Sequence, residues 1–220
     1  MCKVRQSETS AEQSVRDASK ACAEQAAGNG SGLDADLASG NASKACTEQR
    51  FRNTAGIAGG MERADQICAH PRWQKCVRDI AKAERTRQFC RHDTVHFLDV
   101  ARLAQIENLE RGLGIEKELI YAAALLHDIG RQMQYEKGIP HDEASVMLAE
   151  GLLTECGFSE AERTEILGAI AAHREPKTRF RDDLAGVLYR ADKQSRMCMF
   201  CGAEPECDWS EEKKNLHLRR

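Results

Sequence analysis

The sequence predicts an all-α protein, a bundle of roughly six to eight helices preceded by a mobile N-terminal extension. From about residue 65 onward, apolar residues recur at the three- and four-residue spacing that marks the buried face of a helix. No run shows the period-two alternation of a half-buried strand. Aromatic residues make up only 5% of the chain and there are four prolines, which also favours helices over sheets.

Residues 1–64 are expected to form a low-complexity, disordered extension, and residues 65–220 the helical domain. Residues 1–50 contain no aromatic residue, and the stretch AAGNGSGLDADLASGNAS consists mostly of small and polar residues. Such a stretch buries too little apolar surface to offset the entropy of ordering its backbone. The short repeat ASKACAEQ and ASKACTEQ occurs twice, too few copies for a solenoid. The alternative is an arm that becomes ordered when it binds a partner.

Helical order is expected to begin near the stretch MERADQICAHPRWQKC. Pro71 suits the first turn of a helix there, because that turn does not use its N–H group. The next helix is expected from Thr94 to Leu109 and the one after it from Lys117 to Ile129. Apolar residues at helical spacing in the first of these are Val95, Leu98, Leu103, Ala104 and Ile106.

The second half of the domain continues the helical pattern. A helix is expected over His141–Cys156. Ser159 and Glu162 then form an S-x-x-E capping box, which predicts the start of the following helix. That helix must end before Pro176, because proline cannot continue it. The last helix is expected over Asp182–Met197.

Four polar residues fall on the apolar faces of four different helices: His96, His127, His173 and Asp192. Each has apolar neighbours three, four or seven residues away along the chain, which lie on the same face of the helix. Each could be an ordinary buried residue with its own hydrogen-bond partner. A buried carboxylate, however, is costly without a cation, and one divalent ion would satisfy all four groups. Imidazole and carboxylate together suit Fe, Mn or Zn better than Ca.

The ordered series of these residues resembles the HD-domain superfamily of metal-dependent phosphohydrolases. The resemblance rests on His96 in HFLDVARLA, the doublet His127 and Asp128 in ALLHDIG, and Asp192 in YRADK, and it covers about residues 66–197. It implies an all-α fold with one or two bound divalent transition metal ions. It also implies hydrolysis of a phosphoester or phosphoanhydride, usually in a nucleotide.

Two further histidines, His141 in GIPHDEAS and His173 in AIAAHREP, are similar in place to residues of the binuclear members of this superfamily. Those members include bacterial diadenosine tetraphosphate hydrolases and cyclic-dinucleotide phosphodiesterases. The GYP motif of the second group is not found here, and Arg174 occupies the position where a further histidine often follows. His141 alternatively is an exposed loop residue, and His92 is interpreted as a first-turn residue or a partner of a ligand.

The resemblance implies specific roles for these side chains. His96, His127, Asp128 and Asp192 are expected to bind one metal ion, and His141 and His173 a second, with Asp128 as the bridge. Asp128 is therefore a candidate catalytic residue. Three cations are candidates for stabilising charge that develops on the phosphoryl group: Lys193, Arg174 and Arg131.

The stretch MCMFCGAEPECDW places Cys198, Cys201 and Cys207 in a C-x2-C-x5-C array. Its first pair has the spacing of structural zinc sites, and Cys90 is the candidate for a fourth ligand. An iron–sulfur cluster is the other metal hypothesis, and buried thiols that bind nothing are the alternative.

Composition excludes some classes of function. A net charge of −3 argues against a general nucleic-acid binder, and no stretch approaches the roughly 20 apolar residues of a membrane span. The first residues carry no secretory signal, so a cytoplasmic protein with reduced cysteines is expected. The expected partner is a small phosphorylated substrate, and the oligomeric state stays open. The alternatives to the hydrolase are a non-catalytic regulatory module that binds a metal or nucleotide, and a di-iron oxygenase.

Overall fold

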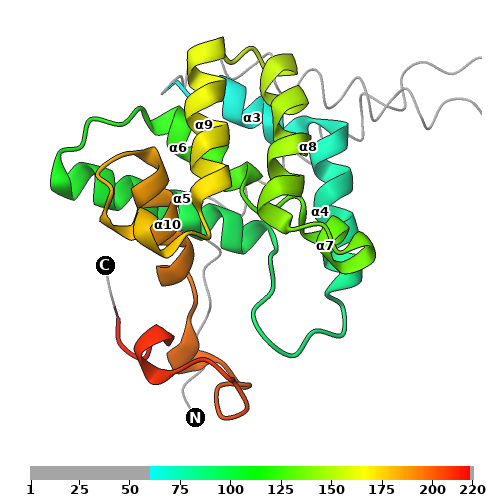
Figure 1. The fold of residues 1–220 in the computed structure, drawn as a ribbon, viewed down its shortest axis with the longest axis vertical. Coiled ribbons are helices and arrows are strands. Elements are labelled where there is room, and N and C mark those ends of the chain that lie inside the picture. Colours follow the sequence, from blue (N-terminus) through cyan, green and yellow to red (C-terminus); the bar gives the residue numbers. More distant parts are fainter. Residues whose placement is uncertain (1–59, 219–220) are drawn as a thin grey trace, which may run out of the picture. The chain divides into compact units, whose positions relative to one another are not determined.

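The computed structural model describes residues 60–218, and over this range the protein is all-α, as the sequence predicted (Figure 1). The α-helices are α3 (Glu62–Ala69), α4 (Pro71–Ala83), α5 (Thr94–Arg111), α6 (Lys117–Leu126), α7 (Arg131–Lys137), α8 (His141–Glu155), α9 (Glu160–Ala172) and α10 (Leu184–Gln194). Short 3-10 helices are η1 (Pro176–Phe180), η2 (Cys198–Phe200) and η3 (Glu211–Lys213). The expected N-terminal extension lies outside the described residues as far as residue 59. Helix α3 begins at Glu62, just before the expected domain boundary.

Side-chain caps fix where several of these helices begin. The Asp93 carboxylate accepts a hydrogen bond from the backbone N–H of His96 at the start of α5. The predicted capping box at α9 is present, with Ser159 and Glu162 each bonded to the backbone of the other. Asp183 caps α10 as Asp93 caps α5, since its carboxylate accepts a hydrogen bond from the backbone N–H of Gly186. These caps fix the starts of α5 and α10, which carry His96 and Asp192.

The helix that was expected to run from Lys117 to Ile129 ends earlier, at Leu126. The reason lies in His127, whose Nδ1 lies 2.7 Å from the carbonyl oxygen of Ala124. That side-chain contact satisfies a carbonyl at the helix end, which otherwise lacks a partner. His127 and Asp128 therefore sit in a turn at the end of α6.

The core is formed where α5 packs against α6 and α10, and where α9 packs against α6, α8 and α10. Figure 1 shows α8 and α9 side by side. The run Ala122–Ala124 on α6 is fully buried, and its small side chains let neighbouring helices approach closely. Large side chains that are also fully buried include Phe97, Ile120, Leu126, Leu152, Ile166, Ile170 and Leu188.

The expected apolar face of α5 is only partly correct. Val95 is 62% exposed and Ile106 is 38% exposed, although both match the helical spacing. The buried face instead includes the polar residues Glu107 and Asn108. Hydropathy alone does not locate this face, because the buried side of α5 pairs its polar groups with partners from elsewhere in the chain. None of the described helices combines the length and hydropathy that a membrane span requires.

Gly130 marks a close approach between the turn after α6 and helix α8. A Cβ atom at this position would lie 2.5 Å from the backbone nitrogen of Ser145 and 2.7 Å from the Cβ of Ala144. The Gly130 N–H also donates to the Ser145 hydroxyl, at 2.9 Å. We expect Gly130→Ala to lower the free energy of unfolding by about 1–3 kcal/mol, because backbone must move to admit the methyl group.

The matched control is Gly168→Ala, in α9, where an added Cβ meets nothing within 4 Å. This change is expected to leave stability unchanged or raise it by up to about 1 kcal/mol, since alanine favours a helix. Urea unfolding of both variants is the measurement. Equal stabilities of the two variants would contradict the close approach at Gly130.

Candidate metal centre

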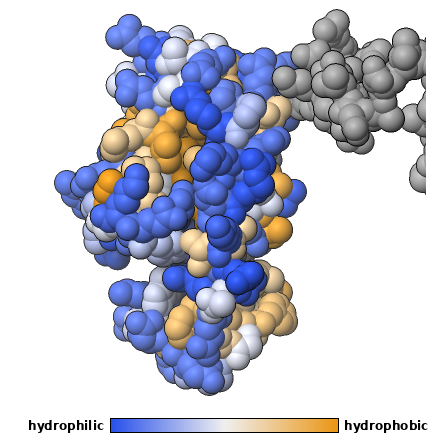
Figure 2. All heavy atoms as spheres, turned by 90° about the vertical axis from the view of Figure 1, so that its right-hand side faces the viewer, coloured by the Kyte–Doolittle hydropathy of each residue, from blue (hydrophilic) through white to orange (hydrophobic). Residues whose placement is uncertain are grey.

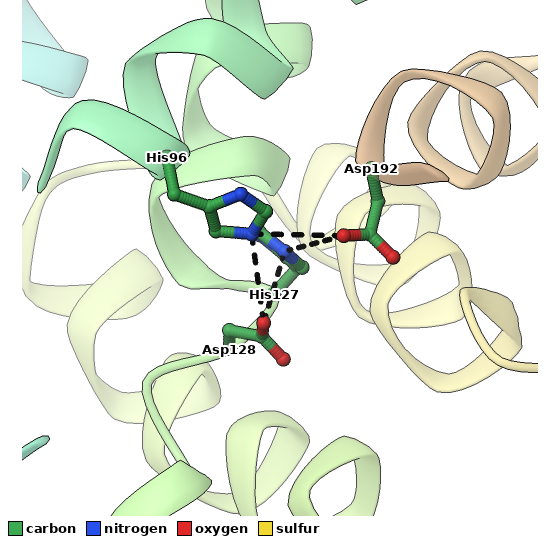
Figure 3. Close-up of side chains that lie close together, drawn as sticks. All are labelled: His96, His127, Asp128 and Asp192. Atoms are coloured by element: carbon green, nitrogen blue, oxygen red, sulfur yellow. Dashed lines mark ion pairs between the residues drawn. The ribbon is translucent and has the colours of Figure 1, made fainter. Parts of the chain in front are cut away.

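Four buried side chains from three places in the fold converge on one point (Figure 3). His96 comes from the first turn of α5, His127 and Asp128 from the turn after α6, and Asp192 from α10. One ligand atom of each lies within 4.8 Å of all the others. The Nε2 atom of His96 is 3.6 Å from Asp192 Oδ1 and 3.7 Å from Asp128 Oδ2. His127 Nε2 is 3.4 Å from the same Asp128 oxygen.

A second group of buried ligand atoms shares Asp128 with the first. The other oxygen of this carboxylate, Oδ1, lies 3.2 Å from His141 Nε2 and 3.7 Å from His173 Nε2. His141 starts α8 and His173 follows the end of α9. The two oxygens of one carboxylate therefore face two different sets of imidazoles.

The backbone fixes the tautomers of two of these imidazoles. His127 Nδ1 lies 2.7 Å from the carbonyl oxygen of Ala124, and His173 Nδ1 lies 2.6 Å from that of Ile170. A carbonyl can only accept a hydrogen bond, so each Nδ1 carries the proton. Each Nε2 then presents a lone pair toward Asp128, as a metal ligand requires.

The other two imidazoles are oriented by side chains. The hydroxyl of Ser195 donates to the carbonyl oxygen of Asp192 at 2.8 Å, so it accepts from His96 Nδ1 at 3.2 Å. His141 Nδ1 lies 2.5 Å from the amide oxygen of Gln134 and donates to it. Burial lowers the pKa of His141 to about 3, although the nearby Asp128 carboxylate acts in the opposite direction. At neutral pH this ring is therefore unprotonated, with its Nε2 lone pair free.

Several of these inward-facing atoms have no partner within the protein. His96 Nε2, His127 Nε2 and Asp192 Oδ1 are buried and make no hydrogen bond. The Nε2 atoms of His141 and His173 lie 3.2 Å apart, and two lone pairs cannot form a hydrogen bond with each other. Buried polar atoms are rarely left without partners. A set of unpartnered nitrogen and carboxylate lone pairs fits divalent transition metal ions.

The two carboxylates are held in their ionised form. Burial alone would raise the pKa of Asp128, but the neighbouring imidazoles and the positive charge of Arg131 outweigh it and hold that pKa well below the usual range. Burial would likewise raise the pKa of Asp192, and the neighbouring Lys193 reverses this effect. Arg131 Nε lies 3.1 Å from Asp128 Oδ1, and Lys193 Nζ lies 2.5 Å from Asp192 Oδ2. Both carboxylates are therefore available as ligands at neutral pH.

Comparison with known proteins agrees with this geometry. The family model of the HD domain matches residues 94–197, a range that contains every residue of both ligand groups. The chain belongs to the HD-domain superfamily. A protein of Clostridium beijerinckii, described only as uncharacterized, is 45% identical to this HD-domain protein over 137 residues. These residues make up 62% of the present chain and 85% of that relative. No solved structure matches the chain.

The three cations singled out in the sequence have different places in this HD-domain protein. Arg131 and Lys193 each contact one of the two buried carboxylates, as described above. Arg174 instead pairs with Asp142 at 2.9 Å, and its side chain is 46% exposed. Its partner Asp142 belongs to the acidic first turn of α8. No contact given by the structure joins Arg174 to a ligand residue in the described part of the chain.

His92 lies closer to the centre than its sequence context indicated. The ring is 3% exposed, and its Nε2 is 3.7 Å from Asp128 Oδ2. Its Nδ1 lies 2.6 Å from Glu84 Oε1, and the Tyr135 hydroxyl donates to the same oxygen. Glu84 and Tyr135 could not be recognised from the sequence. Glu84 lies eight residues before His92, just after α4, where no helical spacing relates the two, and Tyr135 lies on α7, far along the chain. The contacts make His92 a partner of the centre, oriented by a buried carboxylate.

Replacing Glu84 tests this buried arrangement through stability. Burial would raise the pKa of Glu84, but hydrogen bonds from His92 and Tyr135 outweigh it and lower the pKa from 4.5 to about 2. Since the folded value is the lower one, this stabilisation is present above pH 4.5 and is lost as the pH falls toward 2. We expect Glu84→Gln to lower the free energy of unfolding by about 2 kcal/mol at pH 7.

The difference in the free energy of unfolding between Glu84→Gln and the wild type should become smaller as the pH falls below 4.5. Urea unfolding of metal-free protein at pH 7 and near pH 3 measures this. Glu165→Gln, on the exposed face of α9, is the control and should change stability little at either pH. If this difference in the free energy of unfolding were the same at both pH values, the charge of Glu84 would not stabilise the fold.

The four cysteines of the expected structural site all line one cavity of about 330 Å³. They are Cys90, Cys198, Cys201 and Cys207, and all are free thiols. No cysteine of residues 60–218 belongs to a group of three ligand atoms that lie within 4.8 Å of one another. The structure thus gathers the thiols around a shared space without closing them to the distances of a metal site.

Proposed function

We propose that this HD-domain protein is a metal-dependent phosphohydrolase that acts on a small phosphorylated substrate, a phosphoester or phosphoanhydride and most specifically a nucleotide. The observation that carries the proposal is the pair of buried ligand groups that share Asp128. Membership of the HD-domain superfamily supports the class of reaction. The nucleotide is proposed on the resemblance to binuclear members of that superfamily.

The ligand sets follow from the directions of the lone pairs. His96, His127, Asp192 and the Oδ2 atom of Asp128 would hold one ion. His141, His173 and the Oδ1 atom of Asp128 would hold a second. Bound divalent ions supply Lewis-acid chemistry, which activates water for attack on phosphorus and neutralises charge on the phosphoryl oxygens.

The protein contributes orientation and charge around these ligands. Arg131 is largely buried and donates to both oxygens of Asp128, through Nε to Oδ1 and through Nη2 to Oδ2, so it keeps the plane of that carboxylate fixed between the two groups. Lys193 binds Asp192 Oδ2 and so leaves Oδ1 directed inward. The Lys193 side chain is 38% exposed, which places a cation where an anionic substrate can approach from solvent.

Purified full-length protein, stripped of metal and reloaded with Mn²⁺, Fe²⁺ or Zn²⁺, tests the proposal. Phosphate release would be measured on a panel of nucleotides and simple phosphoesters, together with oxygen consumption. We expect phosphate release from at least one substrate, only in the reloaded protein. Metal binding without turnover would favour the regulatory module, and oxygen consumption without phosphate release would favour the oxygenase. Equal activity in the stripped and the reloaded protein would overturn the proposal.

A further inference from the structure

We propose that Cys90, Cys198, Cys201 and Cys207 form a tetrathiolate zinc site that ties the C-terminal segment, residues 195–218, to the loop before α5. The four cysteines come from two stretches more than 100 residues apart in the chain, yet they line the same cavity. The family match ends at residue 197 and begins at residue 94, so it includes none of them. The site would therefore be separate from the HD-domain centre.

The backbone around the three C-terminal cysteines forms consecutive tight turns, each of which begins or ends at a cysteine. The N–H of Cys201 donates to the carbonyl of Cys198, that of Glu204 to Cys201, and that of Cys207 to Glu204. Each bond closes a turn of four residues, so Cys198 and Cys201 lie at the two ends of one turn. This C-x2-C turn is the arrangement in which structural zinc sites present two sulfurs toward one point.

Cations outnumber acids around the cavity, which favours thiolates. Arg91, Arg196 and Lys214 line it together with the cysteines, and so do Asp99 and Glu204, of which Glu204 pairs with Lys214 at 2.7 Å. The Arg196 side chain is only 9% exposed, and its buried Nη1 atom makes no hydrogen bond. Burial raises the pKa of the Cys90 thiol, and Arg196 acts in the opposite direction. Four thiolates around one Zn²⁺ leave a net charge of −2, and these cations would offset it.

The C-terminal segment needs a cross-link, because it has little core of its own. Its regular structure consists of the short 3-10 helices η2 and η3, and Cys198 and Ala203 are its buried apolar residues. Apart from the contact of Ser195 with His96 Nδ1, its hydrogen bonds run within the segment or to the end of α10, as from Asn215 to the carbonyls of Lys193 and Arg196. Small units that lack a core are commonly stabilised by a metal ion.

The segment and the loop between α4 and α5 extend from the same end of the helices (Figure 1). Figure 2 shows that hydrophobic side chains are exposed among hydrophilic ones at this end, and that a hollow separates it from the helices above. Residues of both parts line the cysteine cavity. Zinc–sulfur bonds are about 2.3 Å long, so binding would draw the sulfurs inward and close the cavity around the ion.

Binding one Zn²⁺ in this way requires each thiol to give up its proton, so up to four protons leave for the solvent. No other reactant is needed. The bound ion would link the segment to the loop through the four sulfurs. Ser195, at the start of the segment, contacts His96 Nδ1, so an ordered segment would also hold that ligand in place.

Metal analysis of the full-length protein can separate the two sites. In a His127→Ala, Asp128→Ala double variant, we expect about one zinc ion per chain to remain. Adding Cys198→Ser and Cys201→Ser should remove it, whereas adding Cys76→Ser, a half-buried cysteine on α4 outside the cavity, should not. A zinc-free His127→Ala, Asp128→Ala variant would overturn the proposal, whatever the fate of the proposed hydrolase.

A measurement on the wild-type protein guards against misfolding of the variants. Alkylation followed by mass spectrometry should find the four cysteines protected in zinc-loaded protein and reactive after chelation, while Cys68 reacts equally in both states. Equal alkylation of the four thiols with and without zinc would contradict the site. Iron with acid-labile sulfide bound at these cysteines would replace zinc by an iron–sulfur cluster and overturn the assignment.

Discussion

Asp128→Ala is expected to remove both ions of the proposed HD-domain centre and to lower the proposed phosphohydrolase activity on the order of a thousandfold or more. Asp128 is the residue that belongs to both ligand groups, and its two oxygens face different imidazoles. Losing both ions would remove several kcal/mol of transition-state stabilisation. Each 1.36 kcal/mol corresponds to a factor of about ten in rate, which sets the expected size of the effect.

The matched control is Asp142→Ala. Asp142 is an acidic residue of the first turn of α8, next to His141 in sequence, but it pairs with Arg174 at the surface. This variant should keep its metal content and most of its activity. Metal analysis of both variants, with phosphate release on the best substrate, gives the answer. Asp128→Ala protein that retains a full metal complement would show that this carboxylate is not the shared ligand.

The stability of Asp128→Ala, with and without added metal, gives a second test of the shared ligand. In metal-free protein, Asp128→Ala leaves Arg131 without its carboxylate partner, so some loss of stability is expected even before metal is added. Added Mn²⁺, which binds thiolates poorly, should raise the melting temperature of the wild type, since a ligand that binds only the folded state stabilises it. The variant should show no such rise. A metal-dependent rise of equal size in both proteins would place the ions elsewhere.

Much of the ligand geometry could be predicted because it follows from helix periodicity. His96 and Asp192 lie on the same helix faces as buried residues such as Val100 and Leu188, so their inward direction could be read from spacing. His127 and Asp128 were harder, because adjacent residues in a continuous helix would diverge by about 100°. They converge because α6 ends at Leu126 and the doublet lies in a turn. The helix end therefore decides the geometry of the doublet.

Contacts between distant segments could not be predicted in the same way. Glu84 bonds His92 across the loop after α4, and Tyr135 on α7 bonds Glu84, while nothing in the local sequence of Glu84 or Tyr135 distinguishes them from surface residues. Arg174 stays a prediction as a cation that stabilises phosphoryl charge: it lies beside His173 in sequence, but its guanidinium pairs with Asp142, which spacing did not indicate. A long cation can follow whichever carboxylate lies within reach, so its direction depends on neighbours that the sequence does not order in space.

Replacing both His141 and His173 by alanine is expected to lower the metal content of the proposed HD-domain centre from about two ions per chain to about one, apart from any zinc held by the cysteines. These residues supply the nitrogens on the Oδ1 side of Asp128, and neither belongs to the group that contains His96 and Asp192. The remaining ligands keep their own supports, such as the contact between His127 Nδ1 and the Ala124 carbonyl.

Activity of this double variant should fall on the order of a hundredfold, because one of two ions that neutralise phosphoryl charge is lost. His70→Ala is the control, since His70 caps α4 and pairs with Glu155 away from the centre.

Because His141 and His173 face each other at 3.2 Å without a shared proton, removing them relieves a contact that is unfavourable without metal. Without metal, the free energy of unfolding of the double variant should therefore be no lower than the loss of two side chains predicts. Added metal should raise the free energy of unfolding of the wild type more than that of the variant. A wild type that binds a single ion, which the variant then keeps, would contradict the binuclear centre and leave a mononuclear one.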